Sequence, residues 1–165
     1  MTNTTVHPRR ARGAFASAAG IAVGLFALSG AANAGQCPAD KRGVDVTKPV
    51  AHAAKGVTDT VLTSIDLAKE TNVKADGRMF RLRRLVVQPG GIVPWHSHGD
   101  RPAIIYVVEG EIVEYASNCA VGILHKAGES TPELKGTAHW WRNMGAKPAV
   151  LLSADLLADP HDKHM

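Results

Sequence analysis

Aromatic side chains and cysteine are scarce in this 165-residue chain: Phe, Trp and Tyr together make up 5% of it, and only two cysteines are present. The chain also lacks a Gly-x-Ser-x-Gly motif, a Walker loop and a dinucleotide-binding glycine motif. These absences give no support to a nucleophile-elbow hydrolase or to nucleotide chemistry. With 45% hydrophobic and 21% charged residues, the composition excludes collagen, coiled-coil and disordered chains. The length suits one domain with a hydrophobic core.

Acidic residues are absent from the first 34 positions, which instead carry Arg9, Arg10 and Arg12, an apolar run over residues 14–28, and Ala32-Asn33-Ala34. This order predicts a signal peptide over residues 1–34, cleaved after Ala34, and a periplasmic or secreted protein with no stable membrane insertion after cleavage. A retained membrane anchor is the alternative, but the run is short and rich in Ala and Gly for a spanning helix. The Arg9-Arg10 pair leaves the twin-arginine route open beside the general export route.

Charge gives no reason to expect a nucleic-acid partner. The formal net charge of +4 falls to about +1 without the three leader arginines, so the basic character belongs to the leader. Cys37 and Cys119 would lie in a compartment where disulfides persist. The sequence therefore allows a disulfide between Cys37 and Cys119, which would attach an N-terminal arm to the rest of the domain.

Short β segments separated by turns dominate the remaining sequence, and one helical turn is expected within residues 66–72. This spacing predicts an all-β sandwich or barrel. We expect an N-terminal arm over residues 35–56, a barrel over 57–158 and a polar tail over 159–165. The strands are predicted at residues 57–65, 79–87, 103–108, 111–115, 121–125, 138–142 and 149–156, with Pro89-Gly90-Gly91 ending the second.

Two histidines two residues apart, His96 and His98, follow that turn. Alternate residues of a strand face the same side, so both imidazoles could reach one metal ion if a third ligand comes from elsewhere. Asp100 is an alternative ligand, because it lies two residues after His98 and would face the same side of a strand. Gly99 and Pro102, however, are expected to bend the chain there. His125 is another alternative if its strand faces inward.

A second segment, residues 128–143, supports a metal site. Together with the segment that contains His96 and His98, it resembles the two motifs of the cupin family. The first family motif reads Gly, five residues, His-x-His, three or four residues, Glu, six residues, Gly; the second reads Gly, five residues, Pro-x-Gly, two residues, His, three residues, Asn. The positions in register are Gly90, His96, His98, Gly110, Gly128, Gly136, His139 and Asn143, whereas Ala103 stands at the Glu position and Leu134 at the Pro position.

The resemblance implies a double-stranded β-helix, the jelly-roll barrel of cupins, with one divalent metal ion held by His96, His98 and His139. Without the Glu, the three neutral ligands leave the ion its full charge and an open position, and they favour imidazole-binding metals. We favour Fe²⁺, with Zn²⁺, Ni²⁺ or Mn²⁺ as alternatives. Parity predicts that the pocket is lined by Ala103, Ile105, Val107 and Trp141.

The expected function is that of an exported cupin, an Fe(II)-dependent enzyme of the dioxygenase type acting on a small molecule. The alternative is a non-catalytic periplasmic cupin that binds a small ligand or the metal itself. The catalytic acid or base is unknown. Arg81, Arg83 and Arg101 are expected on the surface, with binding of an anionic substrate at the barrel mouth as the alternative. A homodimer through an edge strand or the N-terminal arm is a further expectation.

Overall fold

The computed structural model describes Met1 and residues 35–158 apart from residues 71 and 76. The predicted signal peptide, residues 1–34, and the polar tail, residues 159–165, therefore lie outside the described residues. Within the described part, no helix has the length and apolar character needed to cross a membrane.

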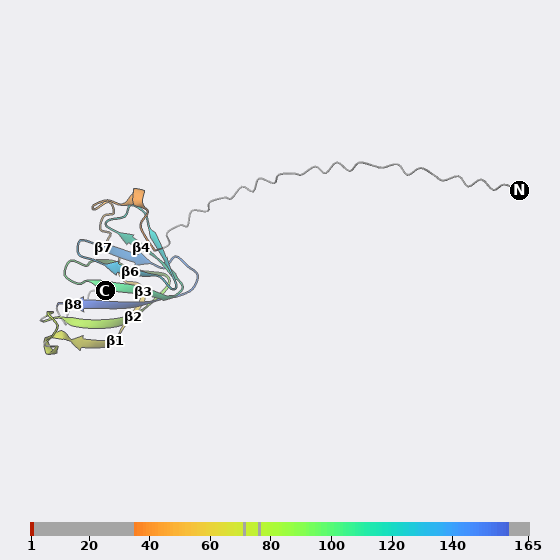
Figure 1. Cartoon of the computed structure of the whole chain (residues 1–165). Coiled ribbons are helices and arrows are strands. Elements are labelled where there is room, and N and C mark those ends of the chain that lie inside the picture. The colour runs from red at the N-terminus through yellow and green to blue at the C-terminus, as the bar shows by residue number, and fades with distance from the viewer. Residues whose placement is uncertain (2–34, 71, 76, 159–165) are drawn as a thin grey trace. The chain divides into compact units, whose positions relative to one another are not determined.

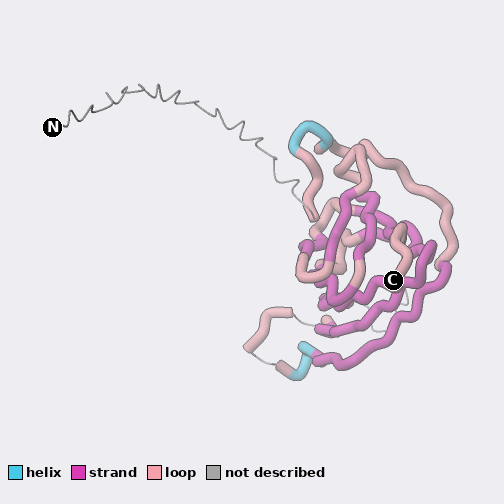
Figure 2. Tube along the Cα trace, turned by 90° about the vertical axis from the view of Figure 1, so that its right-hand side faces the viewer, coloured by secondary structure: helices cyan, strands magenta, loops and turns pink. Residues whose placement is uncertain are grey.

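The fold is a single sheet of eight strands. Figures 1 and 2 show that this sheet is curled. The hydrogen-bonded order is β5-β4-β7-β2-β8-β3-β6, and β1 pairs with β2 beside this path. Two short 3-10 helices are the helical elements of the described residues, η1 (Ala39–Lys41) and η2 (Leu67–Lys69). The strands are β1 (Lys55–Asp66), β2 (Met79–Ser97), β3 (Ala103–Glu109), β4 (Glu111–Ala116), β5 (Ile123–Lys126), β6 (Ser130–Glu133), β7 (Ala138–Arg142) and β8 (Ala149–Leu157).

The core lies inside the curl, because each strand turns alternate residues inward. In β4, for example, Ile112, Glu114 and Ala116 are buried while the residues between them are more exposed. Inward apolar residues from five strands form one cluster, which comprises Leu85, Val87, Val93, Val107, Ile112, Trp141, Ala149 and Leu151. The prediction of an all-β double-stranded β-helix is confirmed.

Strand β2 differs from its prediction, because Pro89-Gly90-Gly91 bends it without ending it. Gly90 adopts a φ of 72°, in the left-handed region that glycine favours, and a Cβ on Gly91 would lie 2.7 Å from the carbonyl oxygen of Gln88. Asn143 holds the bend: its Nδ2 donates to Val87 O at 2.8 Å, and its backbone pairs with Gly90 and Gly91. The first half of β2 therefore pairs with β1 and β8, and the second half pairs with β7. Strand β6 was not predicted.

The N-terminal arm lies along the turn between β4 and β5. Cys37 and Cys119 form a disulfide, and Arg42 forms a β-bridge with Cys119. Thr47 Oγ1 also donates to Cys119 O at 2.6 Å. The arm is thus attached by covalent and hydrogen bonds to the turn that follows β4, the strand that carries Glu114.

Removing the disulfide is expected to lower the stability substantially, because the two cysteines are 82 residues apart. Closing a loop of that length is worth about 4.5 kcal/mol in the chain-entropy model. The double variant Cys37→Ala/Cys119→Ala should lose about that much free energy of unfolding in urea titrations. Reduced wild-type protein should unfold at the same urea concentration as the variant. A loss of free energy of unfolding below about 1 kcal/mol would show that the disulfide constrains the unfolded chain little.

Candidate metal centre

The pairing of β2 with β7 brings the histidines of both motifs together. His96 lies directly opposite His139 in this ladder, so the two side chains share the inner face of the sheet. His98 follows the last residue of β2, and its backbone N–H donates to Thr137 O at 2.9 Å. Strand register and one loop hydrogen bond thus position the three rings.

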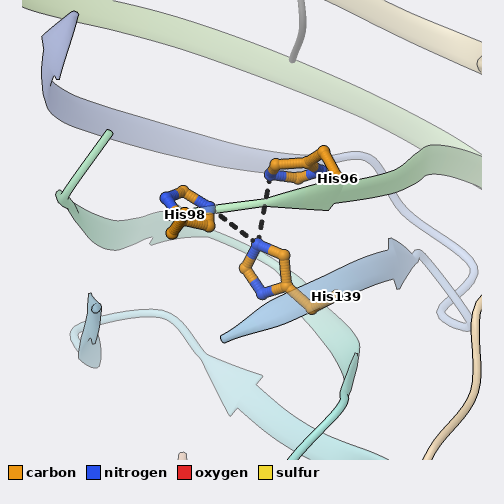
Figure 3. A group of neighbouring side chains, drawn as sticks. All are labelled: His96, His98 and His139. Carbon is orange, nitrogen blue, oxygen red and sulfur yellow. Dashed lines mark hydrogen bonds between the residues drawn. The ribbon is translucent and has the colours of Figure 1, made fainter. Parts of the chain in front are cut away.

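The Nε2 atoms of these rings converge, as Figure 3 shows; we call this group the three-histidine cluster. His139 Nε2 lies 3.0 Å from His98 Nε2 and 3.1 Å from His96 Nε2. Two nitrogens that each lie about 2.1 Å from one ion are about 3.0 Å apart when the angle at the ion is near 90°, and about 3.4 Å apart at the tetrahedral angle. The separations of 3.0 and 3.1 Å therefore fit a common divalent ion.

The partners of the other ring nitrogens fix the tautomers. His96 Nδ1 lies 2.9 Å from Pro94 O and His98 Nδ1 lies 2.7 Å from Arg101 O. Since a carbonyl oxygen only accepts, both Nδ1 atoms must carry the proton and donate it. His139 Nδ1 donates in the same way to Glu114 Oε1 at 2.7 Å. All three Nε2 atoms consequently present lone pairs to one another, an arrangement that suits a cation between them.

The rings of His96 and His98 are held neutral. Burial, followed by repulsion from His139, lowers the pKa of His96 to about 2, and the same two causes lower the pKa of His98 to about 4. Trp141 Nε1 is 3.4 Å from His139 Nε2 and is a distant donor to it. Neutral imidazoles are the form that binds metal, so His96 and His98 are in the ligand state at neutral pH.

Behind His139 lies a buried acidic group that the sequence reasoning missed. Glu114 accepts hydrogen bonds from His139 at 2.7 Å and from His125 Nε2 at 2.9 Å, and Glu133 Oε2 lies 3.3 Å from His139 Nδ1. Although burial acts to raise the pKa of Glu114, the hydrogen bonds from His125 and His139 outweigh it and keep that pKa below its usual value. Burial, and then the charge of Glu114, raises the pKa of Glu133.

Glu114 is placed to orient His139, and its replacement should weaken metal binding. In Glu114→Gln the amide keeps the shape, but its NH₂ group faces an imidazole N–H and breaks one of the two hydrogen bonds. Loss of such an orienting carboxylate typically costs about 10–100-fold in metal affinity. Calorimetric titration of the metal-free variant with Ni²⁺ should reveal this loss. Glu111→Gln, an exposed change on the same strand, should bind as the wild type does; an unchanged Kd in Glu114→Gln would remove Glu114 from the site.

The four predicted pocket residues all face the inside of the barrel, but two of them, Ile105 and Trp141, line the cavity beside the histidines. Ile105 and Trp141 line a cavity of about 20 Å³ together with His96 and His139. Its other walls are Leu85, Val93 and Leu151. Val107 belongs to the apolar core, at 2% exposure.

Ala103 is buried, and its cross-strand neighbours are Glu133 on β6 and Asp155 on β8. Directly opposite residues of an antiparallel pair share a face, so Ala103 stands between two inward carboxylates. Arg101, two residues earlier, holds His98 through its carbonyl oxygen. The position that the first motif reserves for Glu thus adjoins an interior that is already acidic.

The expectation of surface arginines was wrong. Arg83 and Arg101 are 5% and 3% exposed, and the side chain of Arg81 is 12% exposed. Arg81 forms a bidentate pair with the buried carboxylate of Asp155, which also pairs with Arg83 at 3.2 Å. Arg83 pairs in addition with Asp59 of β1. Burying an acid inside the barrel requires such compensation, which explains why Arg81 and Arg83 lie inside.

The two alternative ligands weighed from the sequence lie elsewhere. Asp100 is exposed in the loop after His98. His125 does face inward, at 1% exposure, but it donates to Glu114 instead of joining the three Nε2 atoms. The described residues that the structure brings together as nitrogen ligands are therefore His96, His98 and His139.

Two curated plant proteins are similar to this chain. A germin-like protein of Arabidopsis thaliana, subfamily 2 member 2, is 34% identical over 76 residues, which cover 44% of this chain and 35% of the relative. Nectarin-1 of Nicotiana langsdorffii x Nicotiana sanderae is 29% identical over 119 residues, 70% of this chain and 50% of the relative. This chain therefore spans at most half the length of these two relatives.

A solved structure is similar at a lower level. It is an uncharacterised protein of Klebsiella pneumoniae with a double-stranded β-helix domain, at 18% identity and a TM-score of 0.49, with 72% of this chain and 91% of that chain covered. The model of the Cupin domain family matches residues 83–155, which include both histidine motifs. The chain belongs to the cupin superfamily.

Proposed function

We propose that this cupin binds one divalent metal ion through His96, His98 and His139 and uses it in oxygen chemistry on a small molecule. The observation that carries the proposal is the convergence of three unprotonated Nε2 atoms, with those of His98 and His96 lying 3.0 and 3.1 Å from that of His139. Each has its tautomer fixed by an oxygen acceptor on the far side of the ring.

Fe²⁺ is the ion that we favour. The separations of about 3.0 Å suit angles near 90° at the ion, whereas structural zinc sites are usually tetrahedral. Three neutral imidazoles also leave the ion its full charge and leave positions free for exchangeable ligands. A bound ferrous ion would activate O₂, and the small molecule that is oxidised would supply the electrons.

The chain itself supplies orientation and a dry environment. Glu114 and the carbonyl oxygens of Pro94 and Arg101 hold the rings. The apolar walls of the small cavity beside His96 and His139 would exclude bulk water from a ligand there. Of the described residues lining that cavity, the histidines and Trp141 alone carry polar side-chain atoms, so we assign no separate acid or base.

A second candidate function, metal binding without catalysis, is favoured by the size of the same cavity. A volume of about 20 Å³ admits little more than one water molecule, since one water needs about 10–15 Å³ on this measure. A substrate would have to displace side chains to reach the histidines. A protein that stores or carries the ion would need no such opening.

Export to the periplasm or the medium is part of the proposal. The disulfide between Cys37 and Cys119 supports it, because disulfides persist in oxidising compartments. The intact mass of the exported protein should correspond to a chain that begins at Gly35. Retention of residues 1–34 would favour the anchor instead.

Metal analysis of the tag-free protein, purified without chelator, tests the function. We expect about one iron per chain, and the Fe²⁺ form should bind nitric oxide, an analogue of O₂, with the corresponding electron paramagnetic resonance signal. Iron that fails to bind nitric oxide would favour the non-catalytic function. Protein that takes up no divalent ion would contradict both functions.

A further inference from the structure

A second, larger cavity lies on the side of His139 away from the three-histidine cluster. It has a volume of about 430 Å³, and its walls include the arm residues 35–37 and the buried residues Glu114 and Glu133. We call it the arm cavity. It meets His139 from the Nδ1 side, because both carboxylates contact that atom.

Glu133 is the feature of this cavity that calls for a ligand. Its side chain is 1% exposed, and within the described part of the chain its Oε1 has no hydrogen-bond partner. A buried carboxylate oxygen without a partner is costly, and native proteins commonly satisfy such an atom with an ion or water.

Glu114 supplies a second carboxylate beside the first. Its two oxygens accept one hydrogen bond each, from His139 and His125, which occupy two of about four lone-pair positions. Ligand atoms of Glu114, Glu133 and His139 lie within 4.8 Å of one another. Because His139 Nδ1 already donates to Glu114, the two carboxylates are the groups available to a cation.

The remaining polar wall offers mainly oxygen atoms. Ser130, Thr131 and Thr137 contribute hydroxyl groups, and Asn118 contributes an amide. Arg42 also lines the cavity, but its Nε donates to Cys37 O. Oxygen donors with anionic carboxylates are the ligand set of hard divalent cations.

We propose that the arm cavity is a second cation site, which binds a hydrated hard divalent ion such as Ca²⁺ through Glu133 and Glu114. It is separate from the three-histidine cluster, whose nitrogen ligands suit softer transition metals. Residues of the disulfide-linked arm line this cavity. The arm therefore forms part of a binding site in addition to stabilising the fold.

Calorimetric titration of the chelator-treated full-length mature protein with CaCl₂ tests this site. We expect about one Ca²⁺ per chain and at least tenfold weaker binding in Glu133→Gln, which keeps the size of the side chain and removes its charge. Glu109→Gln, the same change at an exposed position of β3, should bind as the wild type does. Circular dichroism of both variants checks that they fold alike.

A second titration separates this site from the three-histidine cluster. Wild-type protein preloaded with one equivalent of Ni²⁺ should still bind one Ca²⁺ without releasing the Ni²⁺. The affinity for Ca²⁺ should fall, because the two cations repel each other across the hydrogen bond between His139 and Glu114. Release of one Ni²⁺ for each Ca²⁺ bound would overturn the proposal of a separate site. Absence of saturable Ca²⁺ binding, or equal affinity in Glu133→Gln and the wild type, would overturn the cavity site and leave the Ni²⁺ result at the histidines unaffected.

Discussion

His139→Ala is expected to abolish stoichiometric binding of a divalent metal. The Nε2 atoms of His98 and His96 lie 3.0 and 3.1 Å from His139 Nε2. Removal of the His139 ring leaves only His96 and His98, at the end of strand β2, to bind the ion. Loss of an orienting residue alone costs about 10–100-fold in affinity, and loss of a direct ligand should exceed that range. The metal-free variant should also lose about 3 kcal/mol of stability, because Glu114 keeps its buried charge and loses a hydrogen-bond partner.

Metal content after dialysis, together with calorimetric Ni²⁺ titration, measures the first effect, and urea unfolding measures the second. His52→Ala provides a matched control, since His52 is an exposed histidine of the arm. It should retain the wild-type metal content. A His139→Ala protein that still bound one Ni²⁺ with wild-type affinity would exclude His139 as a ligand.

Ala103→Glu should change both the metal preference and the stability. A carboxylate at this position adds a negative ligand to the three histidines, so it should tighten metal binding and shift selectivity toward harder ions such as Mn²⁺. Ala103 lies between the inward carboxylates of Glu133 and Asp155, so the metal-free variant should be destabilised by about 2–4 kcal/mol through unpaired buried charge. Bound metal should restore much of that loss.

Ala103→Gln is the control for volume, because it adds nearly the same side chain without the charge. It should share the packing cost but not the shift toward Mn²⁺. Thermal unfolding with and without one equivalent of Mn²⁺ or Ni²⁺ distinguishes the two variants. If Ala103→Glu left metal selectivity unchanged, Ala103 would not occupy the position of the family's ligand carboxylate.

The sequence was sufficient for the fold and for the three histidines. Period-two alternation identifies most strands, and the spacing of His96, His98 and His139 from the motif glycines is a local property of the chain. Strand β2 was predicted too short, because Pro89-Gly90-Gly91 is a turn signal unless another segment forms hydrogen bonds to the bend. Asn143, more than 50 residues later in the sequence, forms these hydrogen bonds.

The buried acids were harder to predict. Glu114 occupies alternate positions of β4 together with Ile112 and Ala116, which are buried. The alternation of the strand therefore predicts an inward side chain at Glu114. A charged residue at such a position is normally assigned to the surface, and only the partners His125 and His139 make its burial tolerable. Glu133 lies on β6, a strand with no apolar alternation, and its role depends on pairing with Ala103. Arg83 is buried for the corresponding reason, since Asp155 and Asp59 neutralise it.

X-ray absorption spectroscopy of the mature protein loaded with one equivalent of Fe²⁺ or Ni²⁺ tests the three-histidine cluster most directly. The structure predicts multiple scattering from three imidazoles with nitrogen distances of about 2.1 Å, with oxygen donors completing the coordination. The His139→Ala protein should show this pattern no longer. A wild-type spectrum with fewer than three imidazoles around the ion would contradict the proposed metal centre.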